Sequence, residues 1–168
     1  FRPGMYMASA DEVYLKVKGK GGHAAMPENN VDPVVITSQI IVALQQVVSR
    51  MSSPKIPCVL SFGKIIGMGA TNIIPEEVNV EGTFRTMNEE WRAEAHKKIK
   101  KAAESIAEGL GAECEVNIVK GYPYLQNSTE LTLALKKAAQ ELQETCAMLM
   151  RSKANQSDIL EIKKQLEL

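Results

Sequence analysis

Apolar residues recur with two different periods along residues 12–119, and the order of the two periods constrains the fold more than any other feature of the sequence. A period of two, typical of a strand with one buried face, occurs in four segments, 12–18, 57–64, 77–87 and 113–119. Helical spacing occurs at 32–50 and 88–110. The order strand, helix, strand, strand, helix, strand predicts an α+β, ferredoxin-like βαββαβ fold, with a four-stranded antiparallel sheet and two helices on one face.

Both predicted helices begin at a residue that caps helix N-termini. Asp32 precedes Pro33, and Asn88 precedes two glutamates, so each offers an acceptor to the free N–H groups of a first helical turn. Gly111 is expected to end the second helix. The first helix has more apolar positions than packing on one sheet requires, namely Ile36, Ile40, Leu44 and Val47 with Val34, Ile41 and Val48. A second buried face, against another subunit, is therefore expected.

The length of 168 residues suffices for one ordinary domain with an appendage. We expect a linker at residues 1–11, the main α+β domain at 12–123 and a helical segment at 124–168. Ser128 or Thr129 can cap a helix in the last segment, and a second helical pattern follows at 159–166. Because the chain begins with Phe1 rather than methionine, it is expected to be a piece of a longer protein.

The charge balance does not favour binding to nucleic acid. Twenty basic and twenty acidic side chains cancel, and no basic stripe is interleaved with aromatic residues, so a phosphate backbone is little attracted. RNA-recognition motifs share this order of strands and helices, but they expose aromatic residues on their central strands. Here the third strand is predicted to expose Asn79, Glu81, Thr83 and Arg85, while Phe84 faces the core.

Neither a membrane nor the secretory route is expected. The sequence shows no signal peptide and no apolar run of about 18 residues. Its three cysteines, Cys58, Cys114 and Cys146, are far apart and lack a C-x-x-C spacing, which does not favour a disulfide framework or a structural zinc site. This pattern indicates reduced thiols and a cytoplasmic location.

Three polar residues outside the apolar pattern are candidates for function. His23 lies in the loop "GKGGHAAMP", Asn72 in the loop "GATNIIP", and Arg85 on the outward face of its strand. An imidazole and an amide can donate hydrogen bonds to a developing oxyanion, and a guanidinium can grip a carboxylate, so the set suits acyl transfer. The structural alternatives are a solvated turn for His23, turn chemistry beside Gly69 for Asn72, and a surface ion pair with Glu81 for Arg85.

The sequence contains no motif for a catalytic metal or an activated nucleophile. Patterns of the H-x-D, H-E-x-x-H and G-x-S-x-G types are absent. The other histidine, His96, is predicted to lie on a charged helix face among lysines. No metal site is therefore expected in this chain, and the candidate residues would assist a reaction whose centre lies elsewhere.

Three segments together resemble a known family. They are "GMYMASADEVYLKVKGKGGHAAMPENNVDPV", "LSFGKIIGMGATNIIPEEVNVEGTFRT" and "GYPYLQN". They resemble the dimerisation, or lid, domain of the zinc-dependent aminoacylase and carboxypeptidase exopeptidases, especially the N-acyl-amino-acid amidohydrolase branch that includes hippurate hydrolases. The resemblance covers residues 4–142 almost continuously, and its G-G-H-A-A-x-P and G-x-x-x-N-x-I-P patterns are specific in combination.

The resemblance implies a division of labour between two domains. A separate catalytic domain, into whose sequence the lid is inserted, would hold one or two divalent metal ions, with zinc expected, and a general-base glutamate. The residue at His23 would reach over that site, often from the neighbouring subunit, and stabilise the tetrahedral intermediate. Asn72 and Arg85 would contact the carboxylate end of the substrate or the oxyanion. The implied partners are a second copy in a homodimer, the missing catalytic domain and a small N-acyl amino acid substrate.

The sequence departs from the family pattern at both ends. The metal-binding halves are missing, and residues 143–168 do not resemble a return into a metal-binding sheet. We therefore expect the lid domain of a metal-dependent amidohydrolase that acts on N-acyl amino acids or peptide-like amides, inactive by itself. The alternative is a stand-alone homodimerisation module with no catalytic role, in which the helix at 32–50 and the strand at 57–64 join two copies into one sheet.

Overall fold

The computed structural model describes residues 2–151, with side chains up to residue 148. The chain divides into two compact units. One is Met7–Leu125, and the other comprises the described residues of the two chain ends. The first unit contains the main sheet and all three candidate residues, so it is described first.

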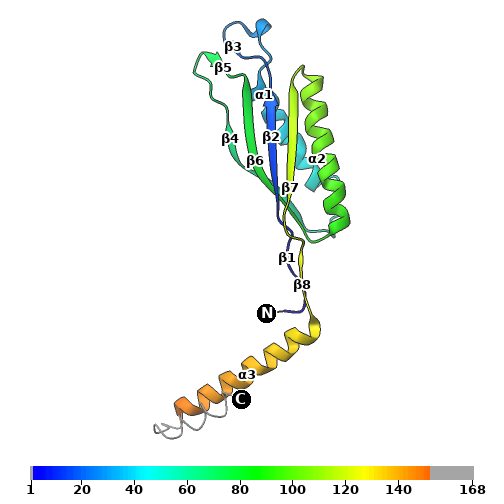
Figure 1. Ribbon diagram of the computed structural model, residues 1–168, viewed down its shortest axis with the longest axis vertical. Coiled ribbons are helices and arrows are strands. Elements are labelled where there is room, and N and C mark those ends of the chain that lie inside the picture. The colour runs from blue at the N-terminus through cyan, green and yellow to red at the C-terminus, as the bar shows by residue number, and fades with distance from the viewer. Residues whose placement is uncertain (1, 152–168) are drawn as a thin grey trace. The chain divides into compact units, whose positions relative to one another are not determined.

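The main sheet has four antiparallel strands in the order β4-β6-β2-β7. Their bounds are β2 Asp11–Lys18, β4 Cys58–Ile66, β6 Glu77–Thr86 and β7 Glu113–Lys120. Helices α1, Pro33–Ser49, and α2, Glu89–Gly109, pack side by side on one face, α1 mainly against β4 and α2 mainly against β7 (Figure 1). This arrangement confirms the predicted ferredoxin-like α+β fold, and it leaves β4 and β7 as the two edges of the sheet.

The predicted caps are present at both helices. The Asp32 carboxylate accepts hydrogen bonds from the backbone N–H groups of Val34, at 2.8 Å, and Val35, at 3.3 Å. The Asn88 side chain accepts one from the N–H group of Trp91 at 2.7 Å. Gly111 has a φ of +79°, a left-handed conformation that favours glycine, just after α2 ends. Local chemistry therefore determines where both helices begin and where α2 stops.

The core lies between the helices and the inward face of the sheet. Its largest fully buried apolar side chains are Val13, Leu15, Val17, Ile40, Leu44, Val47, Val78, Val80, Phe84 and Ile99. Gly82 is needed in this layer because a Cβ there would lie 2.6 Å from the Phe62 ring and 2.5 Å from the Ser61 carbonyl oxygen. The period-two pattern assigned the inward residues of the strands correctly.

Two short ladders and a helical turn were not predicted. Strand β1, Gly4–Met7, pairs with β8, Leu125–Asn127, and β3, Gly22–His23, pairs with β5, Ile73–Ile74. A 3-10 helix, η1, covers Pro27–Asn29. The sequence analysis placed β1 in the linker at 1–11 and β8 in the helical segment at 124–168, and it treated the other sites as loops. Two to four residues are too few to show a period.

Helix α3, Thr129–Arg151, belongs to the second unit. The Ser128 hydroxyl accepts a hydrogen bond from the N–H group of Leu131 at 3.4 Å, in agreement with the predicted cap. The second helical pattern, with Ile159, Ile162 and Leu166, lies outside the described residues. None of the helices in residues 2–151 combines the length and the apolar character needed to cross a membrane.

Candidate functional site

The fold brings His23 and Asn72 together beyond one end of the main sheet. His23 lies opposite Ile73 in the ladder of β3 and β5, and the N–H group of Ala24 donates to the Asn72 carbonyl oxygen at 3.0 Å (Figure 1). The close approach depends on Gly21, because a Cβ there would lie 2.5 Å from the Ile74 carbonyl oxygen. Two loops 49 positions apart in sequence thus present an exposed imidazole and an exposed amide at one place.

The His23 ring is held with one nitrogen free. The backbone N–H group of Ala25 donates to Nδ1 at 3.1 Å, and the Asn30 amide donates to the His23 carbonyl oxygen at 2.9 Å. A neutral imidazole has one donor and one acceptor nitrogen, so acceptance at Nδ1 places the proton on Nε2. Nε2–H is therefore a donor on an exposed residue, and the turn around His23 holds the ring through Nδ1.

Arg85 lies at the other end of the sheet. It faces Val59 across β4 and β6, whereas the loop of His23 contacts the start of β6, where the Glu76 carboxylate accepts from the N–H group of Gly21 at 3.2 Å. From Glu77 to Arg85 the strand rises about 26 Å, at about 3.3 Å per residue. Within one chain, therefore, Arg85 does not join His23 and Asn72 in one site.

The predicted ion pair between Arg85 and Glu81 is not formed. Glu81 instead pairs with Lys64 at 2.6 Å, across the neighbouring strand β4. Among residues 2–151, no acidic group lies within ion-pair distance of Arg85, which is exposed on the outward face of β6. Its guanidinium is therefore available to an external anion.

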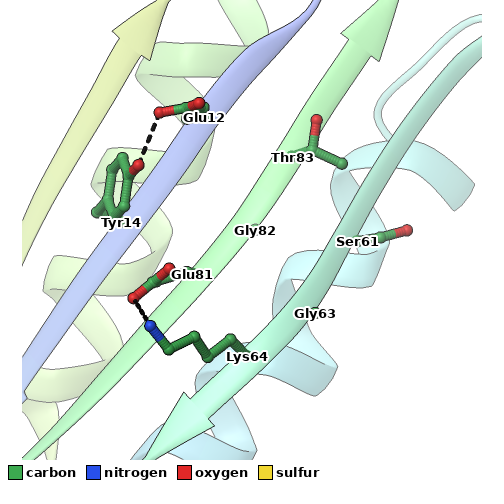
Figure 2. Close-up of a pocket in the computed structure, with 8 residues that line it drawn as sticks. All are labelled: Glu12, Tyr14, Ser61, Gly63, Lys64, Glu81, Gly82 and Thr83. Carbon is green, nitrogen blue, oxygen red and sulfur yellow. Dashed lines mark hydrogen bonds and ion pairs between the residues drawn. The ribbon is translucent and has the colours of Figure 1, made fainter.

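The outward face of the sheet is polar and hollowed. Figure 2 shows one hollow, where Tyr14 donates to Glu12 at 2.6 Å and Lys64 pairs with Glu81, in front of the strands and away from the helices. Gly63, at a bulge in β4, also lines this hollow but has no side chain to fill it. Ion pairs involve most charged side chains of this face, whereas Arg85 has no ion-pair partner in the part of the chain that the structure describes.

A buried charge cluster beside Arg85 was missed by sequence reasoning. The Asp11 and Arg92 side chains are 0% and 1% exposed, and they form a bidentate ion pair. His96 contacts the same carboxylate at 2.7 Å and is only 20% exposed, so its predicted place on a charged outer face is wrong. The signal was present, since Asp11 continues the inward alternation of β2 and Arg92 lies three residues before buried Ala95.

The cluster makes stability depend on pH. Burial raises the pKa of Asp11, but hydrogen bonds from Arg92, Gly121 and His96 outweigh it and hold the pKa of this carboxyl below its ordinary value. The carboxylate therefore stabilises the fold above the unfolded-state pKa of about 3.9, and that contribution is lost as the pH falls through the folded-state value.

We expect Asp11→Asn to show a weaker pH dependence of the urea midpoint below about pH 4 than the unsubstituted chain. Parallel profiles would contradict this assignment.

One edge of the domain carries an apolar patch, which we call the edge patch: Val34, Val35, Ile41, Val42 and Ile65. Val34, Ile41 and Ile65 line a shallow cavity of about 230 Å³ between α1 and β4. Val42 is 72% exposed and Ile65 is 57% exposed. The edge patch includes Val34 and Ile41 from the predicted second face of α1, whereas Val48 and part of Ile41 pack against the core. Burial of this face against another subunit stays a prediction.

The fold is that of a ferredoxin-like α+β domain with an open sheet edge at β4, and comparison with known proteins identifies the family. The peptidase dimerisation domain of the M20 family matches residues 9–110, more than half of the chain. The chain therefore belongs to the M20 peptidase dimerisation-domain family, as the resemblance predicted.

Similar proteins include two curated hydrolases and two solved structures. The N-acetylcysteine deacetylase of Bacillus subtilis is 38% identical over 141 residues, covering 84% of this chain and 37% of the relative. The N-acyl-L-amino acid amidohydrolase of Geobacillus stearothermophilus is 35% identical over 127 residues, covering 76% and 34%. A candidate aminohydrolase from methicillin-resistant Staphylococcus aureus has a TM-score of 0.75 at 34% identity, covering 84% and 38%. A dinuclear metal-binding M20 peptidase from Bacillus subtilis has a TM-score of 0.63 at 29% identity, covering 85% and 34%.

The chain spans little more than a third of the length of these relatives. Within residues 2–151, no three histidine, cysteine, aspartate or glutamate side chains are grouped so that they could hold a metal ion. His96 contacts the Asp11 carboxylate, but Arg92 already occupies this carboxylate, so His96 and Asp11 do not form a pair of metal ligands. The residues described here therefore do not fit the dinuclear site named for the Bacillus subtilis relative.

Proposed function

We propose that this chain is the lid and dimerisation domain of a metal-dependent amidohydrolase that cleaves N-acyl amino acids or small peptide-like amides. One observation carries the proposal: His23 and Arg85 are both exposed and unpaired on their functional atoms among the described residues, yet they lie at opposite ends of one sheet. A site that uses both must draw them from two chains.

Pairing through β4 supplies that arrangement. Two copies joined antiparallel along β4, about a twofold axis, bring the His23 end of one copy beside the Arg85 end of the other. The same axis puts both α1 helices on one side, where the two edge patches cover each other. The open edge of β4 and the edge patch both support this homodimer, because an exposed strand edge and an exposed apolar patch are each costly in a monomer.

The three candidate residues then have distinct roles. Nε2–H of His23 would donate to the oxyanion that forms when the amide carbonyl is attacked. Arg85 would hold the substrate carboxylate through two parallel hydrogen bonds, and Asn72 would donate its amide beside His23. The one or two metal ions, with zinc expected, would have to be held outside this chain, where they would activate the attacking water.

The homodimer can be tested on this chain alone. Ile65→Glu places a charge in the edge patch, and we expect it to shift the chain from dimer to monomer in size-exclusion chromatography with light scattering. Leu110→Glu, at another exposed apolar position, just after α2, is the control and should leave the dimer intact. A monomeric unsubstituted chain at micromolar concentration would overturn the pairing.

The stand-alone homodimerisation module remains the second candidate, favoured by the same edge patch. Both proposals predict a dimer, so the oligomeric state does not separate them. They differ on His23, which has a role only in the amidohydrolase. The activity of a complete enzyme that carries His23→Ala therefore separates them.

A further inference from the structure

A cavity of about 540 Å³ lies beside Arg85 at the end of the outward sheet face. Its walls include Thr83 and Arg85 of β6, Val119 of β7, and Tyr122 in the segment that follows β7. Its volume lies in the range of about 300 to 1,000 Å³ that is typical of small-molecule sites. Tyr122 is 56% exposed, so its ring is a wall that a ligand can still cover.

The buried cluster of Asp11 and Arg92 holds the backbone at Gly121 and Tyr122 in place. Arg92 donates to the carbonyl oxygens of Gly121, at 3.0 Å, and Tyr122, at 3.2 Å, while Asp11 accepts from the N–H group of Gly121 at 3.0 Å. A Cβ at Gly121 would lie 2.1 Å from the Ala10 carbonyl oxygen, so the segment packs closely against the chain before β2. The wall is therefore formed before a ligand arrives, which lowers the entropic cost of binding.

The charges around the cavity favour an anion at Arg85. Asp11 also lines it, but its carboxylate is neutralised by Arg92 and buried. The Glu12 carboxylate also lines the cavity and keeps its charge, but it accepts the Tyr14 hydroxyl at 2.6 Å and forms no ion pair with Arg85 among the described residues. Arg85 is thus the one cationic group among the described lining residues that has no partner, and it lies next to apolar surface from Val119 and Tyr122.

We infer that this cavity is a specificity subsite: Arg85 receives the substrate carboxylate, and Val119 and Tyr122 select an apolar side chain on the same amino acid moiety. The inference rests on the proposed function for the role of Arg85 and extends it to the class of amino acid accepted. Residues with larger apolar side chains, such as leucine and phenylalanine, would bind better than glycine, because they cover the Tyr122 ring and Val119.

The test is a titration of the 168-residue chain followed by amide chemical shifts in NMR. N-acetylphenylalanine at millimolar concentration is expected to shift amides at 83–85 and 119–122, and N-acetylphenylalaninamide, which lacks the carboxylate, is not. Tyr122→Ala should weaken N-acetylphenylalanine binding about tenfold and leave the weaker binding of N-acetylglycine unchanged. Arg85→Gln should weaken both. Ser61→Ala, on the same face but outside this cavity, is the matched control and should change neither.

Three results would overturn the inference. They are an absence of shifts at 83–85 and 119–122, an equal loss of both ligands in Tyr122→Ala, or binding of the amide as tight as that of the acid. Because the titration needs neither a metal nor a second domain, these failures are separate from failure of the proposed function. A monomeric chain that still binds N-acetylphenylalanine at Arg85 would overturn the homodimer and leave the subsite standing.

Discussion

His23→Ala is expected to lower the kcat of a complete enzyme carrying this lid by about 100- to 1000-fold, because removal of one oxyanion donor typically costs that much. The enzyme can be a chimera in which Met7–Leu125 replaces the aligned segment of the Geobacillus stearothermophilus N-acyl-L-amino acid amidohydrolase. Since Nε2–H acts on the developing charge rather than on the ground state, KM should change little. The measurement is steady-state hydrolysis of an N-acyl amino acid.

Asn29→Ala, in the same exposed segment as His23, is the matched control and should retain full activity. Comparable losses in the two variants would mean that the loop matters only for folding. A chimera that is active and unaffected by His23→Ala would reject the proposed role and favour the stand-alone dimerisation module.

Mixing two inactive variants tests whether the site is shared between subunits. In a heterodimer of His23→Ala with Arg85→Ala, one of the two sites would contain both original residues and the other would contain neither. With random exchange, about a quarter of the unsubstituted activity should return. If His23 and Arg85 served the same subunit, every site would lack one of them and mixing would restore nothing.

Arg92→Met is expected to destabilise the domain by about 3 to 5 kcal/mol, because it leaves the Asp11 carboxylate buried without its charge partner. The carbonyl oxygens of Gly121 and Tyr122 would lose a donor at the same time. The free energy of unfolding from urea denaturation, followed by circular dichroism at pH 7, measures the effect. Few other single substitutions in this domain should cost as much.

Arg50→Met removes the same type of side chain at the exposed end of α1 and is the control, with an expected change below about 0.5 kcal/mol. A loss of less than about 1 kcal/mol for Arg92→Met would show that the cluster is solvated or that Asp11 takes up a proton at little cost. In that case the fixed wall of the Arg85 cavity would also lose its support.

The alternation of apolar residues predicted the four main strands and both packed helices because each pattern is local and repeats over seven or more positions. The Asp32 and Asn88 caps were predicted for the same reason, since a cap bonds to groups two or three residues away. The ladder of β3 and β5 has two residues per strand and arises from the close approach of two loops, so no local pattern predicts it.

Candidate residues could be named from the sequence, but their grouping could not. His23, Asn72 and Arg85 were identified as polar residues outside the core pattern, and the family resemblance supplied their expected roles. Asp11, Arg92 and His96 were missed, although the first two lie on inward faces, because a charge on a buried face is interpretable only once its partner is known.

The sequence by itself determined the order of the elements, their capping and the inward faces, all of which depend on contacts within a few residues. Only the tertiary structure decided that His23 meets Asn72 at one end of the sheet while Arg85 lies at the other, and that Asp11 and Arg92, 81 positions apart, neutralise each other in the interior. The physical reason is strand pairing: sheet order and register set which distant side chains become neighbours, and no local periodicity specifies them.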